Sequence, residues 1–173
     1  MIRATSVRLM TALMLTGVMA ASSTMRAQAP AAPAAPMQAP APAVPQVMTY
    51  EMAVTIIDAA EAEARKNKWN VTIVVTDAAG MPVVLRRLTG ASPRSYDIAM
   101  RKAATVVAAK MTTADYGAKL KEKAVTEVPN GITFAGGVPV LRGGTEFIGA
   151  VGTSGVQAIQ DEQISKAGAA VIK

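Results

Sequence analysis

Glycines divide a β-prone stretch near the C-terminus of this 173-residue chain, and they restrict its fold more than any other feature. Residues 136–139 read Gly-Gly-Val-Pro, and residues 148–155 read Ile-Gly-Ala-Val-Gly-Thr-Ser-Gly. A glycine has no Cβ, so it allows left-handed backbone and the close approach of another segment. Because the intervening residues are apolar and β-prone, the pattern indicates tightly packed strands and turns and not a flexible linker.

The first 20 residues have the pattern of a secretory signal peptide. Arg3 and Arg8 come before an apolar run that is short for a bilayer span, and small residues follow at Ala20 and Ala21. We therefore expect residues 1–20 to be removed. The protein is then expected to be secreted, in the periplasm, and without a membrane span after cleavage.

Residues 21–47 form an Ala/Pro-rich segment. Six of the ten prolines lie between positions 29 and 45, most of them separated by alanines. Proline blocks helices and removes backbone donors, so the composition predicts a disordered, extended spacer. The remaining residues, 48–173, suit one compact domain.

Charge and composition exclude several classes of function. The net charge of +6 falls to +4 when cleavage removes Arg3 and Arg8, which leaves 16 basic residues against 12 acidic residues. Such a small excess gives no indication of a nucleic-acid partner. The chain has no cysteine and no histidine, which excludes disulfides, zinc sites of the Cys/His type and His-dependent catalytic triads.

Caps, turn residues and apolar spacing predict the elements of the domain. Helices are expected over 49–68, from Ser92 and Pro93 to about 110, over 113–125, and from near Gly155 onward, where Ser154 and Gln157 have the spacing of a capping box. Strands are expected over 71–76, 83–88, 132–135, 138–141 and 146–153, with Gly143 and Gly144 in a two-residue hairpin turn. This order predicts an α+β domain with a mainly antiparallel, five-stranded sheet covered by helices.

Lys102 is the charged residue whose position on its helix most strongly indicates a special role. On the wheel of the second helix it falls between Val106 and Ala109, at the edge of the buried arc. A lysine there extends its ammonium to solvent, forms an internal ion pair, or meets an anionic ligand with a lowered pKa. The sequence leaves these three alternatives open.

Two further features are candidates for binding an anion. Arg87 alternates with apolar residues on the second strand, so its side chain either faces a pocket or pairs with Asp77 or Asp97. The turn at 153–155, formed by Thr153, Ser154 and Gly155, either presents free backbone N–H groups to an anion or serves only to cap the last helix. Convergence of Arg87, Arg94 and Lys102 would suit carboxylates.

Five blocks of sequence, in a fixed order, carry a resemblance to a known family. They are Asp77–Gly80, Arg87–Ala91, Ala99–Thr105, Gly136–Pro139, and Ile148–Gly155 followed by Gln160 and Asp161. In this order the chain resembles the GlcG/HbpS-like family of small haem-associated proteins, which is related to the C-terminal domain of PduO-type proteins. The resemblance implies a profilin-like fold, a homo-oligomer, and a small anionic ligand such as haem or a related tetrapyrrole. The ligand-binding residues that we then expect are Arg87, Lys102, Gly136, Gly137, Thr153, Ser154 and Gly155.

The chain departs from the family pattern in two ways. Thr89 stands where the family usually has an acidic residue, and the absence of histidine removes the usual axial haem ligand. If iron is bound, tyrosine, methionine or lysine must supply the donor, and the available types in or near helices are Tyr50, Tyr96, Tyr116, Met100 and Met111. The sequence does not choose among them.

Three hypotheses of function follow. The first is a secreted, homo-oligomeric binding protein for haem or a related anionic tetrapyrrole. The second is an enzyme that acts on a small carboxylate, with Lys102 as acid/base and Arg87 as the carboxylate anchor. The third is a structural oligomer without a ligand, in which the glycines and Lys102 serve packing.

Overall fold

The computed structural model describes residues 47–173. The expected signal peptide at 1–20 and nearly all of the expected spacer at 21–47 lie outside the described residues. No helix in 47–173 has the length and apolar character needed to cross a membrane.

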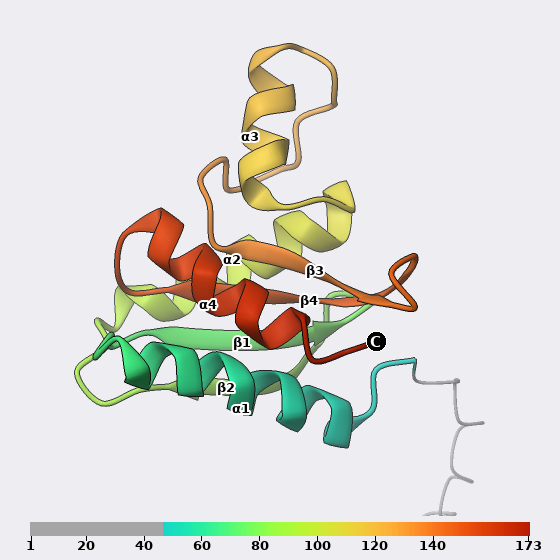
Figure 1. Ribbon diagram of the computed structural model, residues 1–173. Helices are drawn as coiled ribbons and strands as arrows, with labels where there is room; N and C mark the ends of the chain where they lie inside the picture. Colours follow the sequence, from blue (N-terminus) through green and yellow to red (C-terminus); the bar gives the residue numbers. More distant parts are fainter. Residues whose placement is uncertain (1–46) are drawn as a thin grey trace, which may run out of the picture. The chain divides into compact units, whose positions relative to one another are not determined.

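The described chain forms an α+β fold, as predicted (Figure 1). The elements are α1 (Tyr50–Lys66), β1 (Thr72–Asp77), β2 (Pro82–Arg87), α2 (Arg94–Ala109), α3 (Thr113–Lys121), β3 (Gly137–Arg142), β4 (Glu146–Ser154) and α4 (Ala158–Ala169). The sheet has the order β2-β1-β4-β3, and every neighbouring pair is antiparallel.

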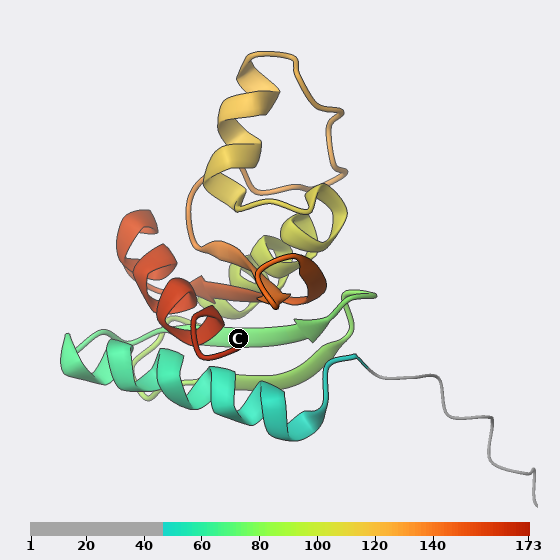
Figure 2. The same cartoon turned by 45° about the vertical axis from the view of Figure 1, so that its right-hand side comes forward.

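Helices cover both faces of the sheet (Figures 1 and 2). In β1, Ile73 and Val75 belong to the apolar cluster that includes α1 and α4, whereas Val74 belongs to the cluster under α2. Alternate residues of a strand point to opposite faces. The sheet is therefore the middle layer of three, with α1 and α4 on one face and α2 on the other.

The predicted fifth strand, at 132–135, is absent, so the described sheet has four strands. The backbone N–H of Ile132 donates to the side chain of Thr105 on α2, at 2.9 Å, and not to a neighbouring strand. Gly136 then has a φ of +127°, which turns the chain before β3 begins. The segment is β-prone in composition, but its hydrogen bonds connect it to a helix.

Several boundaries also differ from the prediction. The helix expected from Ser92 begins at Arg94, and the helix expected over 113–125 ends at Lys121. The capping box lies three residues further along than expected, between Gln157 and Gln160. The hairpin between β3 and β4 has three connecting residues, because Thr145 follows the two left-handed glycines and donates its N–H to Arg142.

Gly152 explains how closely α2 approaches the sheet. A Cβ at this position of β4 would overlap the backbone carbonyl of Ala99 and the backbone of Ala103, both on α2. Any side chain there would therefore push α2 away from β4. This confirms that the glycine-rich strand is packed tightly against another element.

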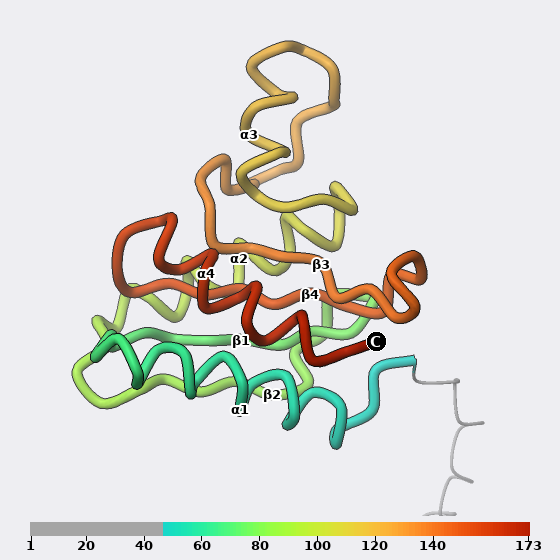
Figure 3. Tube along the Cα trace, viewed as in Figure 1, coloured from blue at the N-terminus to red at the C-terminus, as the bar shows by residue number. Residues whose placement is uncertain are grey.

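The segment that we name the arm, residues 113–136, projects beyond the sheet (Figures 1 and 3). It contains α3 and the chain that returns to β3. Gly117 on α3 lies against the backbone carbonyl of Thr133, where a Cβ would not fit. The two passages of the arm are thus packed directly against each other near its base.

Candidate functional site

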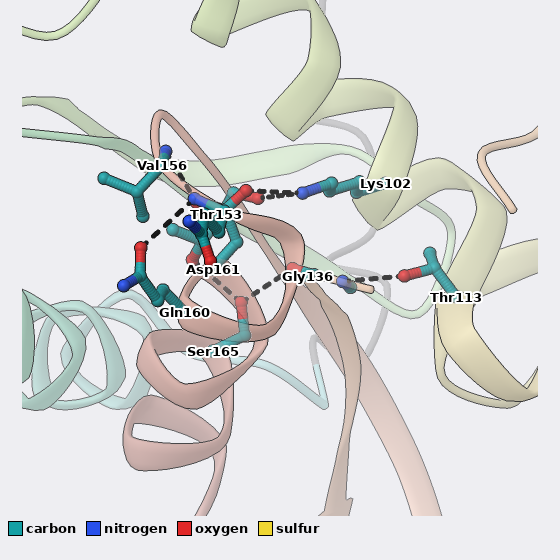
Figure 4. Close-up of polar contacts among 10 residues, drawn as sticks. Lys102, Thr113, Gly136, Thr153, Val156, Gln160, Asp161 and Ser165 are labelled. Carbon is teal, nitrogen blue, oxygen red and sulfur yellow. Dashed lines mark hydrogen bonds and ion pairs between the residues drawn. The ribbon is translucent and has the colours of Figure 1, made fainter. Parts of the chain in front are cut away.

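Lys102 has no exposed surface and forms a buried ion pair. Its Nζ donates to Oδ2 of Asp161 on α4 at 2.8 Å and to the carbonyl of Thr153 on β4 at 2.8 Å (Figure 4). The Asp161 side chain is only 3% exposed. Of the three alternatives for Lys102, the structure shows the internal ion pair.

Burial shifts both members of this pair toward their neutral forms. Desolvation lowers the pKa of Lys102, and the attraction of Asp161 opposes that shift. Desolvation likewise raises the pKa of Asp161, against the attraction of Lys102. A lowered pKa is typical of a lysine that acts as a catalytic base, but the Lys102 side chain has no exposed surface that a substrate can reach. The hypothesis of Lys102 as acid/base therefore has no support in this geometry.

Asp161 also holds the turn that follows β4. Its Oδ1 accepts the backbone N–H of Val156 at 3.2 Å, while its Oδ2 accepts Lys102. Since Lys102 bonds to Thr153, the pair contacts the chain on both sides of Ser154 and Gly155. The backbone of the 153–155 turn is thus fixed by internal partners.

Gly136 and Gly137 belong to the same buried polar network (Figure 4). The carbonyl of Gly136 accepts the Ser165 hydroxyl at 2.8 Å, and Gly137 donates its N–H to the Thr113 hydroxyl at 3.0 Å. A Cβ on Gly136 would overlap the Lys102 ammonium. The predicted set Lys102, Gly136, Gly137 and Thr153 is therefore brought together, but in the interior.

Arg87 lies apart from that network. It is exposed at the end of β2, its Nε donates to the carbonyl of Ala91 at 3.2 Å, and within residues 47–173 it forms no ion pair with Asp77 or Asp97. Its register partner on β1 is Thr72, which is opposite Ser154 on β4. Arg87 and Ser154 thus lie in one row of the sheet, and the predicted convergence with Lys102 does not occur.

A small pocket lies where α2 begins, at the end of this row. It has a volume of about 220 Å³ and is lined by Ser92, Arg94, Ser95, Ile98, Ser154, Gly155 and Val156. The hydroxyl of Ser95 bonds to the Thr72 hydroxyl and to the carbonyl of Ser92, so it is already satisfied. The pocket is below the range of about 300–1,000 Å³ that is usual for ligand sites.

A larger groove lies at the base of the arm, which we name the arm groove. It has a volume of about 370 Å³. Its walls come from the end of α2, from α3 and from the segment 125–129, and its lining is mostly apolar: Ala108, Ala109, Met111, Tyr116, Val125, Thr126, Glu127, Val128 and Pro129. This groove was not predicted, because the segment 125–129 has no periodic pattern.

Two of the five donor residues considered for iron line the arm groove. Tyr116 is buried, and its Oη accepts the N–H of Val128 at 2.8 Å. Met111 is half-buried at the corner between α2 and α3. Of the others, Tyr50 and Tyr96 are exposed on helices, and Met100 packs against the core under α2. The described residues hold no group of three or more Asp or Glu side chains arranged for a metal ion.

Comparison with known proteins identifies the family. The model of the family described as "Haem degrading protein HbpS-like" matches residues 48–170. Protein GlcG of Escherichia coli K12 is 37% identical over 110 residues, which cover 62% of this chain and 81% of that protein. An uncharacterised 15.0 kDa protein of Citrobacter freundii, from a dhaT-dhaS intergenic region, is 31% identical over 129 residues, or 70% of this chain and 90% of that protein.

Solved structures agree with this assignment. A double mutant of Streptomyces reticuli HbpS has a TM-score of 0.67 and 33% identity, covering 83% of this chain and 98% of that chain. The complex of PduOC with haem has a TM-score of 0.61 and 27% identity, covering 73% of this chain and 95% of that chain. The family match spans almost the whole described domain, and the five sequence blocks fall within it. This chain therefore belongs to the HbpS-like family.

Proposed function

We propose that this protein binds haem or a related anionic tetrapyrrole, and that the arm groove is the binding site. The observation that carries the proposal is an apolar groove of ligand size in a chain whose relatives include a haem complex. Its volume of about 370 Å³ lies within the usual range of about 300–1,000 Å³. A pocket of about 430 Å³ on α4 is also in this range, but one of its four lining residues, Ile159, is apolar, and the others are Glu162, Gln163 and Lys166. When bound, haem supplies an iron centre whose reactivity depends on its axial ligand and on access to solvent.

The residues of the groove fit this ligand chemically. Seven of the nine lining residues are alanine, valine, proline, methionine or tyrosine, which suits a flat apolar macrocycle. The exposed lysines Lys119, Lys121 and Lys123 lie in sequence directly before the wall segment 125–129. The one charged side chain in the groove lining is that of Glu127, so the cations that pair with the propionates must come from outside the lining, and we assign this role to the three lysines.

Secretion and self-association are part of the same proposal. Secretion rests on the signal-peptide pattern of residues 1–20. Self-association is supported by large apolar side chains on the surface, since Ile159 is 79% exposed on α4 and Phe134 is 46% exposed on the arm. Contiguous exposed apolar patches mark surfaces that contact a partner, and we propose that these two side chains belong to such surfaces.

The test is a titration of the full chain with ferric haem, followed through the Soret band. We expect saturation at a fixed ratio and a band distinct from that of free haem. Ala108→Trp fills the groove and should weaken binding at least tenfold. The matched control is Ala170→Trp, at an exposed position after α4 and outside the groove lining, which should bind as the unsubstituted chain does.

Each outcome decides one part of the proposal. A spectrum that stays that of free or aggregated haem, in the unsubstituted chain, would overturn the haem proposal. Equal affinity of Ala108→Trp and Ala170→Trp would keep haem as the ligand but overturn the arm groove as its site.

A further inference from the structure

We propose that the thioether sulfur of Met111 is the axial ligand that this chain supplies to haem iron. The inference rests on the proposed haem function and goes beyond it, because it assigns the donor atom. Histidine and cysteine are absent from the whole chain, so the usual nitrogen and thiolate donors are excluded. Tyrosine, methionine and lysine are the remaining donor types, and the lining of the arm groove contains a tyrosine and a methionine but no lysine.

The described tyrosines do not present a free oxygen to the arm groove. Tyr50 on α1 and Tyr96 on α2 are exposed and lie outside the groove lining. Tyr116 lines the groove, but it is 1% exposed and its Oη already accepts the N–H of Val128 at 2.8 Å. Ligation through Tyr116 would require its Oη to give up the hydrogen bond from Val128 and to leave its enclosed position.

Met111 differs from the other methionines in the described part of the chain. Met48 is buried in the core, and Met52 packs against the same core cluster. Met100 packs under α2, and Met81 is exposed in the hairpin turn between β1 and β2. Within residues 47–173, Met111 is the methionine that lines the arm groove.

The backbone on both sides of Met111 is fixed by helix ends. Lys110 is the left-handed C-cap of α2, with a φ of +56°, and its N–H donates to the carbonyl of Val106 at 2.7 Å. Thr112 is the N-cap of α3, and its hydroxyl oxygen accepts the N–H of Asp115 at 3.1 Å. A residue held between two caps loses little backbone freedom when it binds a ligand, which favours affinity.

The neighbouring ammonium does not compete for this role. Lys110 Nζ lies 3.7 Å from the centroid of the Phe147 ring, so it is engaged in a cation–π contact. A thioether is also neutral and soft and needs no deprotonation before it binds a metal. Ligation by Met111 therefore predicts a haem affinity with little pH dependence and a raised iron reduction potential.

The experiment compares Met111→Leu with Met81→Leu in the full chain loaded with haem. Leucine conserves volume and apolar character but has no donor atom. In Met111→Leu we expect a changed Soret and visible spectrum of the bound haem, haem affinity at least tenfold lower, and a lower reduction potential. Met81→Leu, at an exposed methionine outside the groove, should keep all three values.

Met111→His provides the second variant. It should retain haem and show the spectrum of imidazole ligation, which would support the position as axial. If Met111→Leu keeps the spectrum and affinity of Met81→Leu, Met111 is not the ligand, and the haem function stands. If the unsubstituted chain binds no haem, the proposed function fails first, and this inference fails with it.

Discussion

Lys102 and Asp161 form a buried ion pair of 2.8 Å that joins α2 on one face of the sheet to α4 on the other. Both side chains are almost completely enclosed, so each depends on the other for compensation of its charge. Residues that are distant in sequence thereby hold the Gly136 and Gly155 turns in one arrangement. The first prediction concerns this pair.

Lys102→Met should destabilise the fold by about 3–5 kcal/mol, because it leaves the Asp161 charge buried without its partner. The double variant Lys102→Met with Asp161→Leu should be more stable than the single variant. Urea unfolding of both proteins measures the difference. The exposed hairpin pair Arg142–Glu146 is the control, and its removal should change stability by about 0–1 kcal/mol. A single variant as stable as the double variant would contradict this account.

Gly136→Ala should be strongly destabilising, by at least about 3 kcal/mol, because two penalties combine. Gly136 has a φ of +127°, and a Cβ there would displace the Lys102 ammonium. Gly143→Ala is the matched control: its φ is +60°, but a Cβ would meet nothing within 4 Å. It should cost only about 1–2 kcal/mol. Similar denaturation midpoints for the two variants would show that the contact with Lys102 has no effect.

Glu61 should contribute to stability above acidic pH and lose that contribution as pH falls. The hydrogen bond from Arg86, with a smaller effect of Arg65, outweighs burial and lowers the pKa of Glu61 below its usual value of 4.5. A carboxyl with a lowered folded pKa stabilises the fold above the unfolded pKa, and the effect disappears as pH falls through the folded pKa. Denaturation midpoints from pH 6 to pH 3 should therefore fall less steeply for Glu61→Gln than for Glu122→Gln, an exposed control.

Tyr116→Phe should make the segment 125–129, which forms one wall of the arm groove, more mobile. The change removes the acceptor of the Val128 N–H and costs about 1 kcal/mol. Hydrogen exchange should become faster at Val128 and its neighbours, while the amides of β1 stay protected. Unchanged exchange at Val128 would mean that another group holds the segment 125–129 in place.

Local patterns were sufficient to predict most of the elements. β-branched residues marked β1 and β2, and Thr49 marked the start of α1, where it caps the helix as expected. The segment 132–135 was wrongly predicted as a strand, because its composition is as β-prone as that of β1 and β2. Its structure is decided by the Thr105 hydroxyl, which accepts the Ile132 N–H. Thr105 lies on a helix earlier in the chain, so the sequence of 132–135 alone does not indicate this contact.

The candidate site was less predictable for the same reason. A helical wheel placed Lys102 at the edge of the buried arc, but it could not identify Asp161, far along the chain, as the partner. The arm groove forms where α2, α3 and the irregular segment 125–129 meet, and only Met111 and Tyr116 had been considered from chemistry. Tertiary contacts create the groove, so periodicity and motifs did not reveal it.

The central ladder of the sheet pairs Thr72, near the start of the domain, with Ser154, near its end. The hairpin of β1 and β2 consequently cannot bury its second edge until β4 has left the ribosome, so local contacts alone do not complete the sheet. Pairings of this range slow folding, because a long loop must close before the contacts form. Synthesis through Ser154 therefore precedes completion of the sheet, and β1 keeps an unpaired edge until then.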